Sequence, residues 1–351
     1  MSSGSNIEWT DASWQVTSGC TKVSPGCKNC YAETMANRLA GMALKDLDAG
    51  RYPKGKASYL TVISNGAWNR KVVTLPENLT IPLRWKKPRM IFVNSMSDLF
   101  HADVPFEFVD QVFAVMAVAH HHTYQVLTKR PERMAEYFAR GYLPIERAAR
   151  PVFTLHGREP APRRTDPIGK LMHGEGLEHV WIGTSVENQE TANERVPQLL
   201  RCPATIRFLS VEPLLDDVDL RMEKTEDWTA ADYKRDKIDP LDVKPYRRIP
   251  FGIDWVIVGG ESGHDARPCD VGWIRSVVRQ CAEAGVPCFV KQVGARPCGF
   301  DQWSHPDNEG RGIDIGGDTG RKLADSKGGD PAEWPADLRV RQMPARQAVP
   351  S

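Results

Sequence analysis

The chain of 351 residues is 41% hydrophobic and 26% charged, with 46 Lys and Arg against 45 Asp and Glu, a composition typical of a globular protein with a real core. The near-zero net charge argues against a protein that tracks duplex DNA through a broad basic face. No apolar run approaches the roughly 18 residues of a membrane helix, and the first residues lack the features of a signal peptide, so we expect a cytoplasmic protein without membrane contact.

The chain repeats one unit, in which a short β-branched run is followed by a polar cluster and then by a stretch with helical periodicity. A short strand is predicted near 14–19, and the helix after it is predicted to place Met35, Leu39 and Met42 on one face. Between 59 and 75, a Ser-Asn-Gly run separates two apolar runs and predicts a hairpin or bent excursion. The later strands are predicted at 89–94, 124–128, 180–186, 205–211, 255–258 and 287–292.

Apolar strands that alternate with helices predict a parallel sheet covered on both faces. Because the strands are more numerous than most open sheets of this length require, we expect a complete or partial (β/α) barrel over residues 1–298, with an open doubly wound sheet as the alternative. Surface insertions are predicted at about 141–178, which is rich in Arg, Pro and Gly, and at about 221–250, which is charged. Residues 299–351 are polar and are predicted to be a C-terminal extension packed on the barrel.

Polar and charged side chains follow the predicted strands. In parallel α/β folds the loops after the strands converge on one face, so we expect these side chains to line a shared polar pocket, although any one of them alone would be explained by a helix cap. They are Asn94, Ser95, Ser97 and Asp98; Thr128 and Lys129; Thr184, Ser185, Glu187 and Asn188; Ser210 and Glu212; Glu261 and Ser262; and Lys291 and Gln292.

Three thiols lie within eleven residues, at Cys20, Cys27 and Cys30, separated by six and then two residues. Thiolates are the ligands of iron–sulfur clusters and of zinc. A structural zinc usually takes four ligands, and this segment contains no His. Three cysteines on a four-iron cluster leave one iron open to a small molecule. We therefore favour a cluster, with zinc bound through a distant fourth ligand and unliganded thiols as alternatives.

The other cysteines and a histidine run receive structural interpretations. Cytosolic disulfides are disfavoured. Cys281 and Cys288 fall within the apolar pattern of a helix and a strand and are predicted core thiols. The run His120–His122 ends a helix and is predicted to be a polar turn. Three cysteines lie in predicted loops without a second cysteine two or three residues away: Cys202, Cys269 and Cys298.

A cysteine triad after the first strand of an α/β barrel resembles the radical S-adenosylmethionine superfamily. Most of its members separate the cysteines by three and then two residues, whereas six and then two residues separate them here. Further segments resemble a narrower, phage-associated branch, and together they extend from residue 6 to about 295. These segments are Asn6–Asp11, Gly19–Cys27, Asn94–His101, Leu127–Pro131, Gly183–Asn188, Ser210–Leu214 and Gly259–Gly263.

The resemblance implies a [4Fe–4S] cluster, with S-adenosylmethionine bound at its fourth iron. The cluster ligands would be Cys20, Cys27 and Cys30. The cofactor contacts would be Ser95, Ser97 and Asp98 at the methionine end, and Ser185 and Glu187 at the ribose hydroxyls. The residues left for the charged groups of the substrate, and so for catalysis, would be Glu212, Glu261 and Lys291.

Some members of this branch are similar to enzymes that hypermodify thymidine in phage DNA and so protect it from host restriction. The resemblance implies an isomerase that converts N-linked to C-linked glycyl-thymidine in the host cytoplasm, with flavodoxin or ferredoxin as electron donor. Hydrogen abstraction from an unactivated glycyl carbon is a task for cofactor chemistry. The alternatives are a radical enzyme acting on another nucleotide, a tRNA or a peptide, a zinc-containing barrel hydrolase, and a non-catalytic DNA-binding protein.

Overall fold

Seven parallel strands form one sheet whose spatial order follows the chain, β1-β6-β7-β8-β9-β12-β14. The computed structural model describes residues 7–155, 176–223, 237–238, 252–299 and 323–345. The strands are β1 (Ala12–Trp14), β6 (Met90–Val93), β7 (Thr123–Thr128), β8 (Val180–Ser185), β9 (Arg207–Val211), β12 (Trp255–Gly259) and β14 (Cys288–Gln292).

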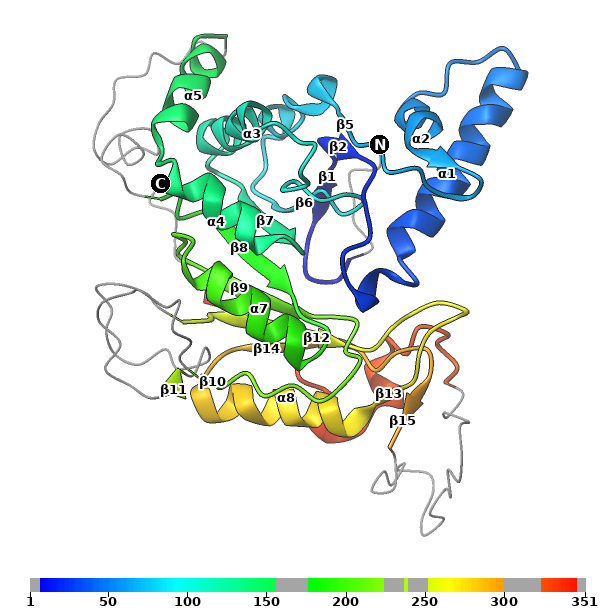
Figure 1. The fold of residues 1–351 in the computed structure, drawn as a ribbon, viewed down its shortest axis with the longest axis vertical. Helices are drawn as coiled ribbons and strands as arrows, with labels where there is room; N and C mark the ends of the chain where they lie inside the picture. Colours follow the sequence, from blue (N-terminus) through cyan, green and yellow to red (C-terminus); the bar gives the residue numbers. More distant parts are fainter. Residues whose placement is uncertain (1–6, 156–175, 224–236, 239–251, 300–322, 346–351) are drawn as a thin grey trace.

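The sheet curls into a half-barrel (Figure 1). Its order lacks the reversal that defines a doubly wound sheet, so the prediction of a complete or partial barrel is confirmed in its partial form. The six later strands were predicted at these positions. The first prediction, near 14–19, was wrong by several residues, because β1 ends at Trp14 and the separate β2 (Thr17–Ser18) pairs antiparallel with β5 (Val73–Thr74).

Helices accompany the strands along the chain. The longer ones are α1 (Tyr31–Asp48), α3 (Phe106–Val118), α4 (Pro131–Ala139), α5 (Leu143–Leu155), α7 (Gln189–Leu200) and α8 (Val271–Ala284). Together α1 and the short α2 (Ala57–Val62) form an arm beside the sheet (Figure 1). No helix in the described part of the chain is both long and apolar enough to span a bilayer.

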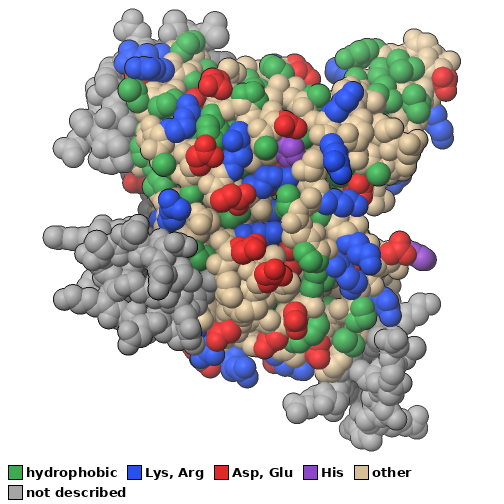
Figure 2. Space-filling model, viewed as in Figure 1, with side chains coloured by type: hydrophobic (Ala, Val, Ile, Leu, Met, Phe, Trp, Pro, Cys, Tyr) green, Lys and Arg blue, Asp and Glu red, His purple; other side chains and the backbone are tan. Residues whose placement is uncertain are grey.

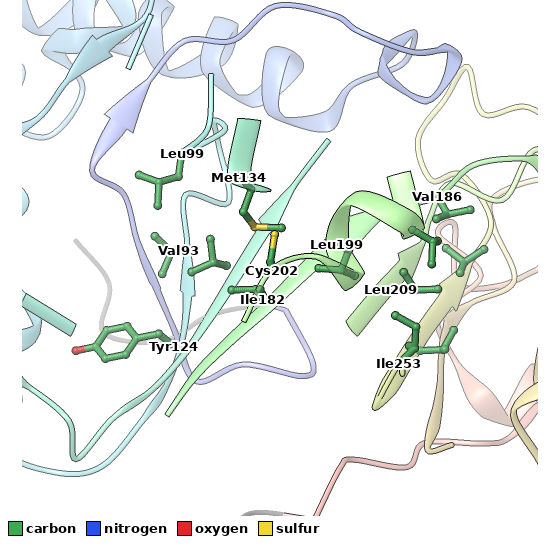
Figure 3. Close-up of a cluster of buried hydrophobic side chains, with 14 of the residues drawn as sticks. Val93, Leu99, Tyr124, Met134, Ile182, Val186, Leu199, Cys202, Leu209 and Ile253 are labelled. Atoms are coloured by element: carbon green, nitrogen blue, oxygen red, sulfur yellow. The ribbon is translucent and has the colours of Figure 1, made fainter. Parts of the chain in front are cut away.

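Side chains alternate between the two faces of each strand and form two separate cores. The outer core packs the strands against helices; in Figure 3, Tyr124 and Ile182 of the sheet lie with Met134 of α4 and Leu199 of α7. The inner core is dominated by aromatic rings, and its buried members are Trp9, Met90, Phe92, Trp181, Ile206, Phe208, Trp255, Ile257 and Phe289. The concave side of the sheet is therefore packed, with Trp9 covering the strands near their amino ends.

Of the two predictions made for residues of this arm, the hairpin is confirmed and the apolar face of the helix is wrong. Between 59 and 75, β3 (Ile63–Ser64) and β4 (Ala67–Trp68) form the predicted hairpin, with Asn65 and Gly66 at φ 52° and 79° in its turn.

In α1, the predicted apolar face was wrong, because Met35 and Met42 are 41% and 44% exposed and Leu39 is only half-buried. The helix instead buries small side chains, and two of them, Ala36 and Ala40, share a buried cluster with Tyr59 and Val62 of α2, which lets the two helices come close. Ala32 and Ala43 of α1 are buried as well.

Large parts of the two predicted insertions lie outside the described residues. Of the predicted insertion at 141–178, α5 is described and packs on α3 with Ile145 and Ala149 buried. Of the one at 221–250, residues 222–223 pair with 237–238 as β10 (Met222–Glu223) and β11 (Lys237–Ile238). The boundaries of these insertions, and of the 1–298 and 299–351 division, stay predictions.

Residues 323–345 pack beside β14, and residues 340–342 of this segment pair with the outer edge of the strand. Val290 N donates to Val340 O and Gln342 N donates to Cys288 O, both at 2.8 Å. Trp334 anchors this segment, since it is 1% exposed and its Nε1 donates to Gly328 O at 2.9 Å.

We expect Trp334→Ala to lower the free energy of unfolding by about 3–5 kcal/mol, because it removes a fully buried ring and leaves a cavity under the segment. Chemical denaturation followed by circular dichroism measures this change. Met343→Ala is the control: Met343 lies in the same segment, is 38% exposed, and should cost less than about 0.5 kcal/mol. Equal effects of the two substitutions would show that the segment is not held by its core contact.

Candidate functional site

The three clustered cysteines lie on one loop, residues 19–30, between β2 and α1. Gly19 starts the loop at φ 92°, and a Cβ there would lie 2.1 Å from Lys71 O, so this position suits only glycine. A single 3-10 turn at Pro25–Cys27 follows, and Cys30 is the N-cap of α1. The loop thus has defined ends, a turn and a helix start that hold the thiols in place.

Residues after β6 and β7 fasten the first half of this cysteine loop. Thr21 Oγ1 shares a hydrogen bond of 2.8 Å with His101 Nε2. Arg130, directly after β7, donates from Nη2 to Thr21 O at 3.0 Å and from Nη1 toward Cys20 Sγ at 3.9 Å. The Arg130 guanidinium is in turn held by Asp98, whose Oδ2 lies 2.8 Å from Nη1. The loop is therefore docked on the carboxyl ends of the strands.

Glu187, after β8, lies beneath the second half of the loop and is 0% exposed. Its Oε1 accepts from Ser24 Oγ at 2.9 Å, from Arg195 Nη1 at 3.2 Å and from Lys129 Nζ. Burial alone would raise the pKa of Glu187, but Lys129 and Arg195 outweigh it and hold this pKa below its usual range. Gly26 presses on the carboxylate so closely that a Cβ would lie 2.5 Å from Glu187 Cδ.

Glu261, after β12, binds the end of the loop. Its Oε2 accepts from Asn29 Nδ2 at 3.0 Å, and Arg267 reaches both of its oxygens, from Nη2 at 2.6 Å and from Nε at 2.9 Å. Arg267 Nη1 also donates to Pro25 O at 2.9 Å. Burial alone would raise the pKa of Glu261, but the hydrogen bonds from Arg267 outweigh burial and hold this pKa below its usual range.

A fourth pair of opposite charges is more open. Glu212, after β9, accepts from Lys291 Nζ at 2.6 Å and from Gln292 Nε2 at 3.1 Å. The side chains of Glu212 and Lys291 are only partly buried, so both charged groups are accessible to a ligand. Figure 2 shows basic and acidic side chains mixed across the middle of the viewed face, as expected where carboxylates and cations alternate.

The residues predicted to contact the cofactor differ in their burial and in the hydrogen bonds that they make within the protein. The Asp98 carboxylate is buried and accepts from Thr128 Oγ1 at 2.7 Å as well as from Arg130. Ser185 is buried, and Ser97 Oγ donates to Thr17 O at 3.0 Å. In this structure Asp98 and Glu187 make protein contacts that hold the loop, while their assignment to the cofactor remains a prediction.

Sequence reasoning missed three residues at this site. Arg130 and Arg267 bind the loop as described above, and the Tyr31 hydroxyl donates to the backbone carbonyl of Ser95. Arg130 could have been found, because it follows Lys129 at a predicted strand end. Tyr31 directly follows the last cysteine, whereas Arg267 lies in a loop with no local pattern that marks it.

The environment of the thiols determines how easily they ionise. Burial raises the pKa of Cys20 to about 12 and also raises that of Cys30, so without a cation these thiols are protonated at neutral pH. The backbone N–H groups of Ala32 and Glu33, at the amino end of α1, favour the Cys30 thiolate. Cys30 is close enough to Cys20 and to Cys27 to interact with both electrostatically. A bound metal would hold all three as thiolates.

The described residues contain no group of three or more His, Cys, Asp or Glu side chains gathered as they would be around one metal ion. A cluster makes a different demand, since each thiolate would bind its own iron and the three sulfur atoms need not converge on one ion. The donor set of the cysteine loop, three thiols on one segment with Arg130 beside Cys20, fits that group.

The structural interpretations of the other thiols and histidines can be compared with their surroundings. Cys281 and Cys288 are buried in the outer core, which confirms them as core thiols. The run His120–His122 forms the predicted turn, but His122 is buried, with Nε2 3.1 Å from Pro82 O, so the turn is packed and not solvated. Two of the predicted loop cysteines, Cys269 and Cys298, lie in the paired short strands β13 (Cys269–Asp270) and β15 (Pro297–Cys298).

Together, fold and site define an α/β half-barrel protein with a three-cysteine loop over the carboxyl ends of its strands. The chain belongs to the family described as "Protein of unknown function (DUF5131)", whose model matches residues 4–321. No curated protein and no solved structure matches the chain.

We expect Gly26→Ala to lift the cysteine loop, because the added Cβ would overlap the buried carboxylate of Glu187. Alkylation of Cys27, which is buried, should accelerate roughly tenfold in the metal-free protein, equivalent to local opening made easier by about 1.4 kcal/mol. Gly41→Ala in α1 is the matched control, since a Cβ there meets nothing within 4 Å, and it should leave the rate unchanged. An unchanged rate for Gly26→Ala would mean that the loop is not clamped at this point.

Proposed function

We propose that this protein is a radical S-adenosylmethionine enzyme. One observation carries the proposal: the loop with Cys20, Cys27 and Cys30 is docked on the carboxyl ends of a parallel half-barrel sheet, the edge at which α/β enzymes build their active sites. Charged groups from six strands lie at that same edge. The resemblance in the cysteine motif and in six further segments supports the same class.

The cysteines would hold three irons of a [4Fe–4S] cluster, and the buried pairs Asp98–Arg130 and Glu187–Lys129 keep the loop in place. When bound, the cluster would supply the electron that cleaves S-adenosylmethionine to methionine and a 5′-deoxyadenosyl radical. We propose Ser95, Ser97 and Ser185 as polar contacts for the cofactor, in addition to the Asp98 and Glu187 assignments. The protein's contribution would be to bind, orient and shield the reacting groups.

For the substrate, we propose N-linked glycyl-thymidine in phage DNA, converted to the C-linked isomer. Glu212 and Lys291 support this choice, because they form a partly open pair of opposite charges 2.6 Å apart. A glycyl group carries a carboxylate and an amine, which Lys291 and Glu212 could bind respectively. Glu261 is held by Arg267 and would act by keeping the loop and the substrate pocket together.

The proposal also includes an electron donor, a cellular location and a way of holding DNA. A one-electron donor of low potential, such as flavodoxin or ferredoxin, would reduce the cluster in the cytoplasm of the host cell. The near-neutral net charge of +1 indicates that DNA would be held by local contacts at the site, with a small electrostatic contribution from the rest of the surface.

We expect anaerobically purified protein to be brown and to contain about four irons per chain, as a [4Fe–4S] cluster requires. Cys27→Ala should lose the colour and most of the iron, whereas Cys281→Ala, which changes a core thiol, should keep both. Reduction with S-adenosylmethionine present should release 5′-deoxyadenosine from the wild type and from Cys281→Ala, but not from Cys27→Ala. A colourless protein that binds zinc would instead favour a barrel hydrolase.

The substrate is tested separately on the iron-loaded enzyme. DNA containing N-linked glycyl-thymidine should yield, after digestion to nucleosides, a product of unchanged mass and altered chromatographic retention. Lys291→Met should lower turnover while 5′-deoxyadenosine formation without substrate stays close to that of the wild type. Cofactor cleavage without any change in this DNA would reject the substrate and leave the enzyme class standing.

A further inference from the structure

We propose that the buried Arg130–Asp98 pair sets the reduction potential of the iron–sulfur cluster through Cys20, with Arg130 favouring and Asp98 opposing uptake of the electron. This inference rests on the proposed function, because it requires a cluster on the cysteine loop. It gives Arg130 and Asp98 an electrostatic effect on the cluster through its ligand Cys20, in addition to the cofactor contact proposed for Asp98.

The geometry places a positive group directly against one ligand. Arg130 is 7% exposed, and its Nη1 lies 3.9 Å from Cys20 Sγ. Three further hydrogen bonds fix the orientation of the guanidinium. Nη2 donates to Thr21 O at 3.0 Å and to Thr21 Oγ1 at 2.9 Å, and Nη1 donates to Asp98 Oδ2 at 2.8 Å. The guanidinium therefore cannot turn away from the sulfur without losing several hydrogen bonds.

Asp98 is held just as firmly, and it accepts from the same Nη1 that faces Cys20. Its Oδ1 accepts from Thr128 Oγ1 at 2.7 Å and from Phe100 N at 2.9 Å, and its Oδ2 also accepts from Lys129 N at 3.2 Å. The pair thus presents two fixed, opposite charges to Cys20, since Nη1 contacts both the Asp98 carboxylate and the Cys20 sulfur. Both charges lie where water does not screen them, so their effect on a nearby charge is larger than at the surface.

The chemical step concerned is the addition of one electron to the oxidised cluster, with no bond or proton change in the protein. Cluster potentials depend on net charge, hydrogen bonds to the sulfur atoms and solvent exposure. The added negative charge is stabilised by Arg130, which also donates toward the ligand sulfur, and is repelled by the Asp98 carboxylate. Removing each partner should therefore shift the potential in opposite directions.

The other two thiols have different surroundings. Cys27 Sγ lies 3.8 Å from Ser24 Oγ, a neutral hydroxyl. Cys30 interacts with backbone N–H groups of α1 and with the acidic side chain of Glu33. Cys20 differs from both, because the Arg130 guanidinium contacts its sulfur.

The test is a potentiometric titration of the anaerobic, iron-loaded protein with dithionite, in which electron paramagnetic resonance measures the reduced cluster. Arg130→Gln should make reduction about tenfold less favourable, which for a one-electron couple is a potential lower by about 59 mV. Asp98→Asn should shift the potential upward. Arg130→Lys keeps the charge and should shift it less than Arg130→Gln.

Arg140→Gln and Asp110→Asn are the matched controls, because they change an ion pair between α4 and α3 with N–O 3.3 Å, and they should leave the potential unchanged. Shifts of the same sign for Arg130→Gln and Asp98→Asn, or shifts no larger than in the controls, would overturn the inference. If Arg130→Gln fails to hold iron, Arg130→Lys and Asp98→Asn decide the question by the same criterion. A wild-type protein without a cluster would reject the proposed function itself, and the inference with it.

Discussion

Glu187 places a negative charge where water does not reach, and three elements are arranged around it. Ser24 of the cysteine loop, Lys129 after β7 and Arg195 of α7 all donate to the same Oε1 atom. A buried carboxylate is tolerated only when cations and hydrogen bonds compensate its lost hydration. The loop can therefore adopt this position only when β7, β8 and α7 are already packed together, which couples the arrangement of the thiols to the completeness of the fold.

The sequence predicted the sheet well because both faces of its strands are buried. Strands such as Val180–Ser185 are apolar or β-branched at nearly every position, and polar residues begin where each strand ends. This pattern needs no knowledge of distant contacts. The start of the sheet was harder, because β1 has three residues and an alternating burial pattern, too short for periodicity to place it. The apolar face of α1 was wrong for a related reason, since close helix packing selected alanines over larger apolar side chains.

For the candidate site, sequence reasoning located the edge at which the polar groups gather but not which group meets which. Asp98 binds Arg130, whereas Glu187 binds Lys129. Because these two cations are adjacent in the chain, the pairing depends on the directions in which their side chains point. Arg267 reaches Pro25 O across more than two hundred residues, so no local pattern could reveal that contact. The residues were therefore predictable as a set, whereas their partners depend on three-dimensional packing.

The segment along β14 has a consequence for how the protein behaves in a crowded cell. A half-barrel, unlike a closed barrel, leaves its outermost strands with backbone groups able to pair with another chain. Backbone bonds between β14 and residues 340–342 occupy part of that edge, and Arg341 stacks over Phe289 and contacts Glu8 at 3.3 Å. Residues 340–342 thus cover part of an open sheet edge without closing the barrel, which leaves fewer of its backbone groups free for edge-to-edge pairing with another chain.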